Sequence, residues 1–566
     1  MSGRGTGPGA GGGASAAGTR REDDTIARGT RSRIPVGERR PLIGRRGVVL
    51  CGMPLAQNIA RVVILAVSLL ACKGEKLALD SSDSRPPPPP PTPTISIVGG
   101  ALDPLYATDP AGVPLDVTAA NGDTVRVTVA DATGTVIRTL NDGSMMVDVA
   151  RWDGHDDVGT MAPVGTYTVE AELLDITGAT LAAATAPFYI VRVGVLSGTL
   201  GGDRIPLVWH EQGGVAGAYV VEDATTQTFA IATIDDGTTA TPLPSLWDDL
   251  DSPPASADGV VMPAGYAYDA LPTLSLAVAG DFGDAAVQLT LVGWDEPQTV
   301  SSGDTATFTR KPALAVGPSV VEETVSLSWT VDLGDGSTPV VVGTESLPLR
   351  FYATLGPPGF DQEGPQYSPW VAAIDPALRA IAGVAPTDAD VTSALTTWVY
   401  SDLGIAYDTT YGASYYTTYG GRGYDNSVFD FTSFLARSNG TTVNCSDCAS
   451  ILEAYADMVG CDLQYTILLK NFQLNFIKAI GGTDYTHCPF GPSGCGFSYH
   501  AVTTPDAAVT IYDATLDLDG DDDPSAGPFT DLPVHGVDGT EYLQRLVASH
   551  DEPGVTYNFA QKESLR

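Results

Sequence analysis

The chain has 566 residues, with 30 basic and 68 acidic side chains and a formal net charge of −38. This length is too great for a single hydrophobic core, so we expect three or four domains. The negative charge disfavours nucleic acid and anionic lipid surfaces as partners, because phosphate groups would be repelled. Abundant Gly, Pro, Thr and Val, with few helical patterns before the last third, favour a β-rich extracellular protein.

The first 71 residues predict a leader and an export signal. Residues 1–52 are rich in Gly and Arg, and we expect them to be disordered and untranslated, with Met53 as the true start. Residues 53–71 place Arg61 before a short, mostly apolar run that ends in a small residue, as in a secretory signal. That run is too short to span a membrane.

Residues 72–94 predict a lipid anchor and a tether. The run Leu69-Leu-Ala-Cys72 resembles the lipobox of bacterial lipoproteins, which implies that Cys72 carries lipid and becomes the mature N-terminus. The prolines of Pro86–Pro91 favour stiff polyproline II, at ~3.1 Å per residue, as a spacer rather than a proline-rich ligand. Without residues 1–71 the formal charge is −45. We therefore expect a lipid-anchored protein of the bacterial cell envelope, on the periplasmic or surface face of the outer membrane, whose lipid is its only membrane contact.

Residues 95–195 predict a β-sandwich. Alternating apolar residues indicate strands over 124–130, 135–140 and 165–171. The run Gly134-Thr-Val-Ile-Arg-Thr-Leu140, followed by Trp152-Asp-Gly154 and Pro163-Val-Gly-Thr-Tyr167, resembles the immunoglobulin-like domain of flagellar hook-capping proteins. We expect Trp152 to lie in the core rather than in a binding site.

Residues 196–355 stay rich in strand patterns, with alternation over 274–278, 286–292 and 324–331, and we expect one or two further β-sandwich modules. From residue 356 the pattern changes. Helical spacing predicts one helix over 375–382, with Asp375 as N-cap, and another over 388–403. A Tyr-rich stretch follows at 407–424, and a substrate cleft and a packed loop are equally good interpretations of it.

A third helix is predicted from Cys445 to Val459. Asn444 is a suitable N-cap with Asp447 three residues later, and Gly460 can take the left-handed conformation past the helix end. Its apolar residues fall three and four apart and predict one buried stripe. Cys445 then lies in the first turn, where unpaired backbone N–H groups and the helix dipole favour a thiolate. Cys445 is therefore a candidate nucleophile.

His500 and Asp513 follow on two predicted strands. If Pro505-Asp506 is a two-residue turn, His500 faces Ile511 and Asp513 is its diagonal neighbour on the same face. A carboxylate there would orient the imidazole, and the imidazole would take the thiol proton. The order along the chain suits a catalytic triad.

These motifs resemble the transglutaminase-like superfamily of cysteine enzymes. The resemblance rests on Cys445-x-x-x-Ala449 with Gly460, then His500-Ala, then Asp513-x-Thr515, and it covers roughly the last two hundred residues. It implies that Cys445 is the nucleophile, His500 the base and Asp513 its orienter. The expected fold is multidomain, with N-terminal all-β Ig-like sandwich modules followed by an α+β papain/transglutaminase-like domain at 356–566.

The remaining cysteines suggest disulfides. Cys488 and Cys495 close a short loop and are the favoured bridge, which leaves Cys448 with Cys461, although other pairings stay open. Two rival interpretations are a zinc site of Cys445 and Cys448 with Cys488, Cys495 or His487, and a redox Cys-x-x-Cys. We prefer no metal, because neither rival explains His500 and Asp513.

The acidic run 517–523 has carboxylates at alternate positions, as calcium loops do. Its Gly is fourth rather than sixth and no Glu occupies position twelve, so it is not an EF-hand. A solvated acidic turn is preferred over calcium at Asp517, Asp519 and Asp521, and no cofactor is expected.

Two functions follow from the sequence. The first is an exported, cysteine-dependent acyl-transfer enzyme acting on protein or peptide amides through a thioester, as a peptidase or a cross-linking enzyme. The second is a surface binding or scaffold lipoprotein that keeps the fold without turnover. It is motivated by the multiple β-modules and by Val502, which stands where the transglutaminase-like family usually has an aromatic residue.

Overall fold

The computed structural model describes residues 88–107, 109–210, 219–221, 227–230, 245–246, 260–261, 263–334, 336–362, 364–419, 427–505, 510–548, 559–561 and 564–565. The expected leader, the signal segment, Cys72 and the first part of the tether lie outside these residues. None of the helices in the described ranges combines the length and the hydropathy that a membrane span needs.

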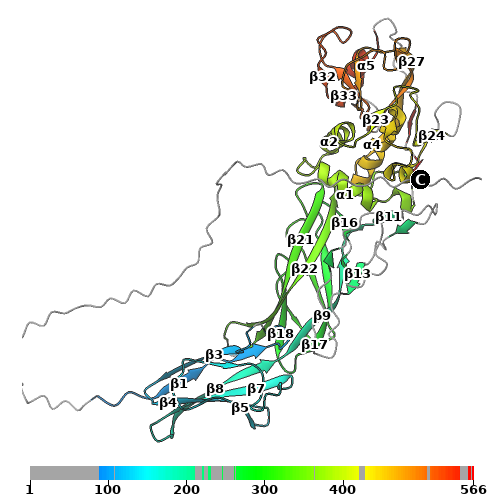
Figure 1. Ribbon diagram of the computed structural model, residues 1–566. Helices are drawn as coiled ribbons and strands as arrows, with labels where there is room; N and C mark the ends of the chain where they lie inside the picture. Colours follow the sequence, from blue (N-terminus) through cyan, green and yellow to red (C-terminus); the bar gives the residue numbers. More distant parts are fainter. Residues whose placement is uncertain are drawn as a thin grey trace, which may run out of the picture. The chain divides into compact units, whose positions relative to one another are not determined.

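The first sandwich is built from two sheets that share one core (Figure 1). Buried and exposed side chains alternate along its strands, as in β4, so one face of each sheet is apolar. Trp152 is fully buried against Tyr167 and Phe188, which confirms its predicted place in the core. The five-stranded sheet has the order β2 (Gly100–Leu102), β8 (Thr180–Ile190), β7 (Gly165–Leu174), β4 (Thr124–Ala130), β5 (Val136–Asp142), and the three-stranded sheet has the order β1 (Thr94–Ile97), β3 (Val113–Ala120), β6 (Val149–Trp152).

A second pair of sheets encloses a separate core, which contains Ala101 and then residues from Val191 onward. Long β21 and β22 form its central hairpin (Figure 1). The six-stranded sheet has the order β10 (Arg204–Ile205), β16 (Ala264–Ala267), β22 (Val340–Thr354), β21 (Ser319–Asp332), β18 (Ala286–Leu291), β19 (Gln298–Val300). The four-stranded sheet has the order β13 (Gln227–Ala230), β9 (Arg192–Gly201), β17 (Thr273–Asp281), β20 (Thr305–Thr309). Two further sheets have two strands each: β11 (Val208–His210) with β12 (Tyr219–Val221), and β14 (Ser245–Leu246) with β15 (Val260–Val261). The N-terminal part is thus multidomain and all-β.

Helices and strands mix after Thr354. The helices are η1 (Pro365–Tyr367), α1 (Val371–Ala380), α2 (Asp388–Ser401), α3 (Phe431–Leu435), α4 (Cys445–Val459) and α5 (Gly539–Leu546). The five-stranded sheet has the order β33 (His535–Asp538), β30 (Thr510–Tyr512), β29 (Gly496–Pro505), β27 (Leu463–Gln473), β34 (Phe559–Gln561). Smaller sheets are β28 (Ile477–Ala479), β31 (Leu516–Asp519), β32 (Asp531–Leu532); β24 (Thr417–Tyr419), β25 (Ser427–Phe429), β35 (Ser564–Leu565); and β23 (Ala406–Tyr407) with β26 (Thr442–Val443).

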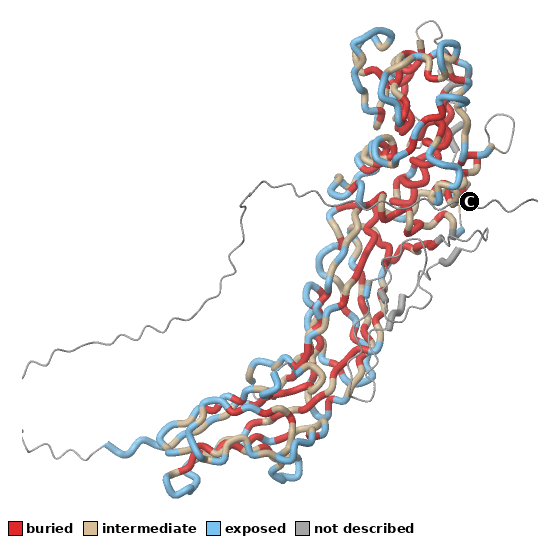
Figure 2. Tube along the Cα trace, viewed as in Figure 1, coloured by how far each residue is buried: buried red, intermediate tan, exposed pale blue. Residues whose placement is uncertain are grey.

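Helix α4 is the centre of this region. Every residue from Cys445 to Val459 is buried (Figure 2). The predicted single buried stripe is therefore wrong, because α1 and α2 pack on the helix on one side and β27 and β29 on another. Its predicted ends are confirmed: Asn444 caps its start, and Gly460 ends it with φ of 100°.

Two other local predictions need correction. Helix α1 begins at Val371 rather than at Asp375, and Pro376 lies inside it, because burial of apolar residues in the first turn extends the helix toward its N-terminus. Strands β29 and β30 pair Thr503 with Tyr512, whereas a two-residue turn at Pro505-Asp506 would pair Thr503 with Ala508. The connection is longer than predicted, and residues 506–509 within it lie outside the described residues.

Candidate active site

The N-terminus of α4 positions Cys445. The side chain of Asn444 accepts a hydrogen bond from the backbone N–H of Asp447, and the Asp447 carboxylate accepts one from the backbone N–H of Asn444. This capping box fixes the first turn, so the Cys445 backbone N–H has no acceptor within the helix. The Cys445 side chain is 3% exposed and packs with Ala449, Tyr465 and neighbouring apolar groups.

His500 and Asp513 form a buried pair beside this helix start. The Nε2 atom of His500 lies 3.0 Å from Oδ2 of Asp513, and both side chains are fully buried. Asp513 also accepts hydrogen bonds from the hydroxyl of Tyr542, at 2.7 Å, and from the backbone N–H of Thr515, at 2.7 Å. Since a carboxylate only accepts, Nε2 must carry the proton in this pair.

The other imidazole nitrogen is left for the thiol. Within the described part of the chain the buried Nδ1 of His500 has no hydrogen-bond partner. Burial lowers the pKa of His500, but the charge and hydrogen bond of Asp513 and the side chain of Cys445 raise it more, to about 10. Cys445 therefore lies close enough to act on the imidazole, and the three residues predicted from the sequence meet in one place.

The raised pKa of His500 predicts a pH-dependent stability. Below pH 6.5 the folded and unfolded states both hold the His500 proton, so the protonated side chain contributes its full stabilising effect to the folded state. Above pH 6.5 the unfolded state loses the proton first, and the free energy of unfolding should fall by about 1.4 kcal/mol per pH unit until about 10. Urea unfolding of wild type and His500→Gln at pH 6.5 and at about 8.5 should show their difference shrinking by about 2 kcal/mol. A difference that does not change with pH would contradict the assignment.

Tyrosine hydroxyls gather around Ser446, next to the thiol. The Ser446 Oγ accepts hydrogen bonds from the hydroxyls of Tyr419 and Tyr465 and lies 2.8 Å from the hydroxyl of Tyr499. We call Ser446, Tyr419, Tyr465 and Tyr499 the hydroxyl cluster. Sequence reasoning missed it, since only Tyr419 belongs to the Tyr-rich stretch and the other two tyrosines lie on separate strands. The alternation within β27 and β29 could have marked their facing sides, but not their meeting with Ser446.

Asp447 ties the Tyr-rich stretch to the same helix turn. Its buried carboxylate accepts hydrogen bonds from the Ser414 hydroxyl and from the backbone N–H groups of Tyr415, Tyr416 and Thr417. Burial raises the pKa of Asp447, although these hydrogen bonds oppose the rise. This part of the stretch is thus an ordered wall of the site, while residues 420–426 lie outside the described residues.

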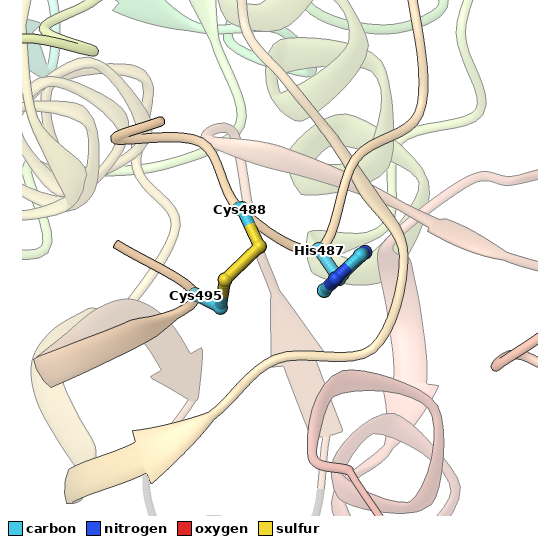
Figure 3. Close-up of side chains that lie close together, drawn as sticks. All are labelled: His487, Cys488 and Cys495. Atoms are coloured by element: carbon cyan, nitrogen blue, oxygen red, sulfur yellow. A yellow bond between two sulfur atoms is a disulfide. The ribbon is translucent and has the colours of Figure 1, made fainter. Parts of the chain in front are cut away.

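The cysteines are arranged differently from the predicted pairs. Cys488 and Cys495 form a disulfide beside His487 (Figure 3), as the sequence favoured. Cys448 and Cys461 are buried and neither is in a disulfide, so their predicted bridge is wrong. They lie at opposite ends of α4, roughly 18 Å apart at 1.5 Å rise per residue, whereas a disulfide needs Cα atoms within about 7 Å.

Neither predicted metal alternative is assembled. Among the described residues the one group with metal-ligand spacing is His487, Cys488 and Cys495, two of which share a disulfide (Figure 3), and it includes neither Cys445 nor Cys448. The calcium candidates do not converge either. Asp517 pairs with Lys478, and the carbonyl oxygens of Asp519 and Asp521 accept from Arg545.

The comparisons with known proteins concern the N-terminal part. The family model of the FlgD Ig-like domain matches residues 106–175, which confirms the predicted resemblance in the first sandwich. No curated protein matches the chain. Similar solved structures include the fibronectin(III)-like modules of Clostridium thermocellum CbhA, 11% identical over 46% of this chain and 94% of that one, with a TM-score of 0.17. Drosophila N-cadherin EC1-4 is 12% identical over 46% of this chain and 49% of that one, with a TM-score of 0.14.

Proposed function

We propose that the region from residue 356 onward is a papain/transglutaminase-like domain that performs cysteine-dependent acyl transfer on protein or peptide amides. The observation that supports this most is the buried His500–Asp513 pair, which leaves Nδ1 of His500 toward the thiol at the start of α4. The family resemblance of the motifs around Cys445 supports the amide as substrate class.

Each step follows from these atoms. Transfer of the Cys445 proton to Nδ1 of His500 gives a thiolate–imidazolium pair, which the raised pKa of His500 favours, and the thiolate attacks the carbonyl carbon of the amide. The C–S bond forms while the carbonyl electron pair moves to oxygen. Collapse of this intermediate breaks the C–N bond, and the imidazolium of His500 gives its proton to the departing amine. The hydrogen bond from Nε2 to Asp513 orients and stabilises the imidazolium throughout.

The thioester then needs an acceptor. Water would release an acid, and a lysine amine would form a cross-link, with His500 taking the acceptor's proton in both cases. The acidic character of the chain, with a formal charge of −38, favours the approach of cationic amines over that of acidic peptides. Both hydrolysis by water and cross-linking to a lysine amine belong to the proposed activity.

Alkylation of the full chain with iodoacetamide near neutral pH tests the activated thiol. Cys445 should be labelled rapidly, and His500→Ala should slow this labelling at least roughly tenfold, because the thiolate loses its partner. Cys448 and Cys461 serve as internal controls, since both are buried thiols outside any disulfide in the same region. Peptide mass analysis separates the three sites.

One specific observation favours a second candidate function, a non-catalytic surface scaffold lipoprotein. Cys445 is only 3% exposed, and the three tyrosines of the hydroxyl cluster pack with it. Such a scaffold would keep the buried residues for packing alone. Slow labelling of Cys445, equal in wild type and His500→Ala, would favour the scaffold and reject the enzyme.

A further inference from the structure

The hydroxyl of Tyr499 lies between the two side chains that flank Cys445. It is 2.8 Å from Oγ of Ser446 and 3.4 Å from Nδ2 of Asn444. Tyr499 also packs against the cluster that contains Cys445. The side chains before and after the candidate nucleophile therefore hold one phenol beside the first turn of α4.

The directions of these hydrogen bonds follow from the donors. Ser446 Oγ accepts from the hydroxyls of Tyr419 and Tyr465, so its own hydrogen is directed to the Tyr499 oxygen. The amide of Asn444 can only donate at Nδ2, so the Tyr499 oxygen accepts there as well. The Tyr499 hydroxyl can therefore donate its own hydrogen to an acceptor. In the resting site the oxygen of Tyr419, 3.1 Å away, can take that hydrogen.

The surroundings keep Tyr499 in its protonated form. Burial, together with the electrostatic effect of the neighbouring Cys445 side chain, raises the pKa of Tyr499 well above its usual range. A phenol in such a place donates a hydrogen bond and does not ionise near neutral pH. An oxyanion is a stronger acceptor than the Tyr419 hydroxyl, since hydrogen bonds to charged groups are roughly twice as strong.

We propose that the Tyr499 hydroxyl is a catalytic residue that binds the oxyanion of the tetrahedral intermediate, together with the backbone N–H of Cys445. This inference rests on the proposed acyl-transfer function. When the C–S bond forms, the carbonyl π electrons move to oxygen, and the two donors stabilise the charge there. When the intermediate collapses, the electron pair returns to form the C=O bond. The Tyr499 hydroxyl keeps its proton and again donates a hydrogen bond to the oxygen of Tyr419.

Two reactions of the same thiol separate this role from a structural one. Acylation of Cys445 by 4-nitrophenyl acetate passes through an oxyanion, whereas alkylation by iodoacetamide is a displacement at carbon that forms none. Tyr499→Phe in the full chain should therefore slow acylation roughly 100-fold and leave alkylation within about twofold. Ser446→Ala, which removes the donor that directs the Tyr499 hydroxyl, should slow acylation roughly tenfold with the same alkylation rate.

Tyr485→Phe is the matched control, because it removes a phenol whose hydroxyl bonds to Leu518 and Asp531, outside the hydroxyl cluster. Both of its rates should equal those of wild type. Acylation of Tyr499→Phe at the wild-type rate would overturn the proposal, and so would an equal loss of both reactions, which would make Tyr499 a support of the thiol. Slow alkylation in wild type itself would reject the acyl-transfer function instead.

Discussion

Asp513→Asn is expected to slow acylation of Cys445 by 4-nitrophenyl acetate on the order of 10³- to 10⁴-fold. The reason lies in the fixed donors around the carboxylate. The backbone N–H of Thr515 points at Oδ1, so the amide oxygen of the variant would take that place. Its NH₂ group would then face His500 Nε2, which must accept, and the imidazole proton would move to Nδ1. With Nδ1 protonated, His500 cannot take the proton of Cys445.

The comparison variant for this result is Tyr542→Phe. It removes one hydrogen bond to Oδ2 of Asp513 and keeps the carboxylate and the imidazole tautomer. Its acylation rate should fall by about tenfold at most, in line with one lost hydrogen bond of about 1 kcal/mol. Rates are measured by the mass of the Cys445 peptide after timed quenching. If Asp513→Asn were no slower than Tyr542→Phe, Asp513 would not set the tautomer.

Asp447→Ala is expected to lower the free energy of unfolding by about 4 kcal/mol or more. The change would remove the carboxylate acceptor of the buried backbone N–H groups of Tyr416 and Thr417, and that of the part-buried N–H of Tyr415. It would also remove half of the capping box at Asn444. The cost adds up because each buried donor without a partner is penalised separately.

Urea unfolding, followed by far-ultraviolet circular dichroism, measures this effect. The matched control is Asp523→Ala, because Asp523 is exposed and accepts a hydrogen bond from the backbone N–H of Ser525. Its cost should stay below about 1 kcal/mol. A loss at Asp447 that is no larger than the loss at Asp523 would show that the Tyr-rich stretch does not depend on this carboxylate.

Much of the candidate site could be predicted because its signals are local. The ends of α4 follow from Asn444, Asp447 and Gly460, whose roles depend only on neighbouring backbone groups. The helix in turn places Cys445 in its first turn. Alternation along the strands likewise indicated the sandwiches and the burial of Trp152, because one face of each sheet must be apolar.

Which strands and cysteines pair depends on contacts between residues far apart in the sequence, and local patterns do not contain that information. The register of β29 with β30 differs from the predicted one, and His500 still meets Asp513, because a shift by an even number of residues keeps both on one face. The expected Cys448–Cys461 bridge conflicted with the length of the predicted helix itself, a conflict that the rise per residue could have revealed.

The sequence by itself therefore determined the helix that carries Cys445, the all-β character of the N-terminal part and the order of the three candidate residues. Only the tertiary structure decided the burial of α4 on every side, the absence of a disulfide between Cys448 and Cys461, and the hydroxyl cluster. The physical reason is the range of the interactions. Caps and strand alternation act within a few residues, whereas Ser446 meets Tyr465 and Tyr499 only after β27 and β29 have packed on α4.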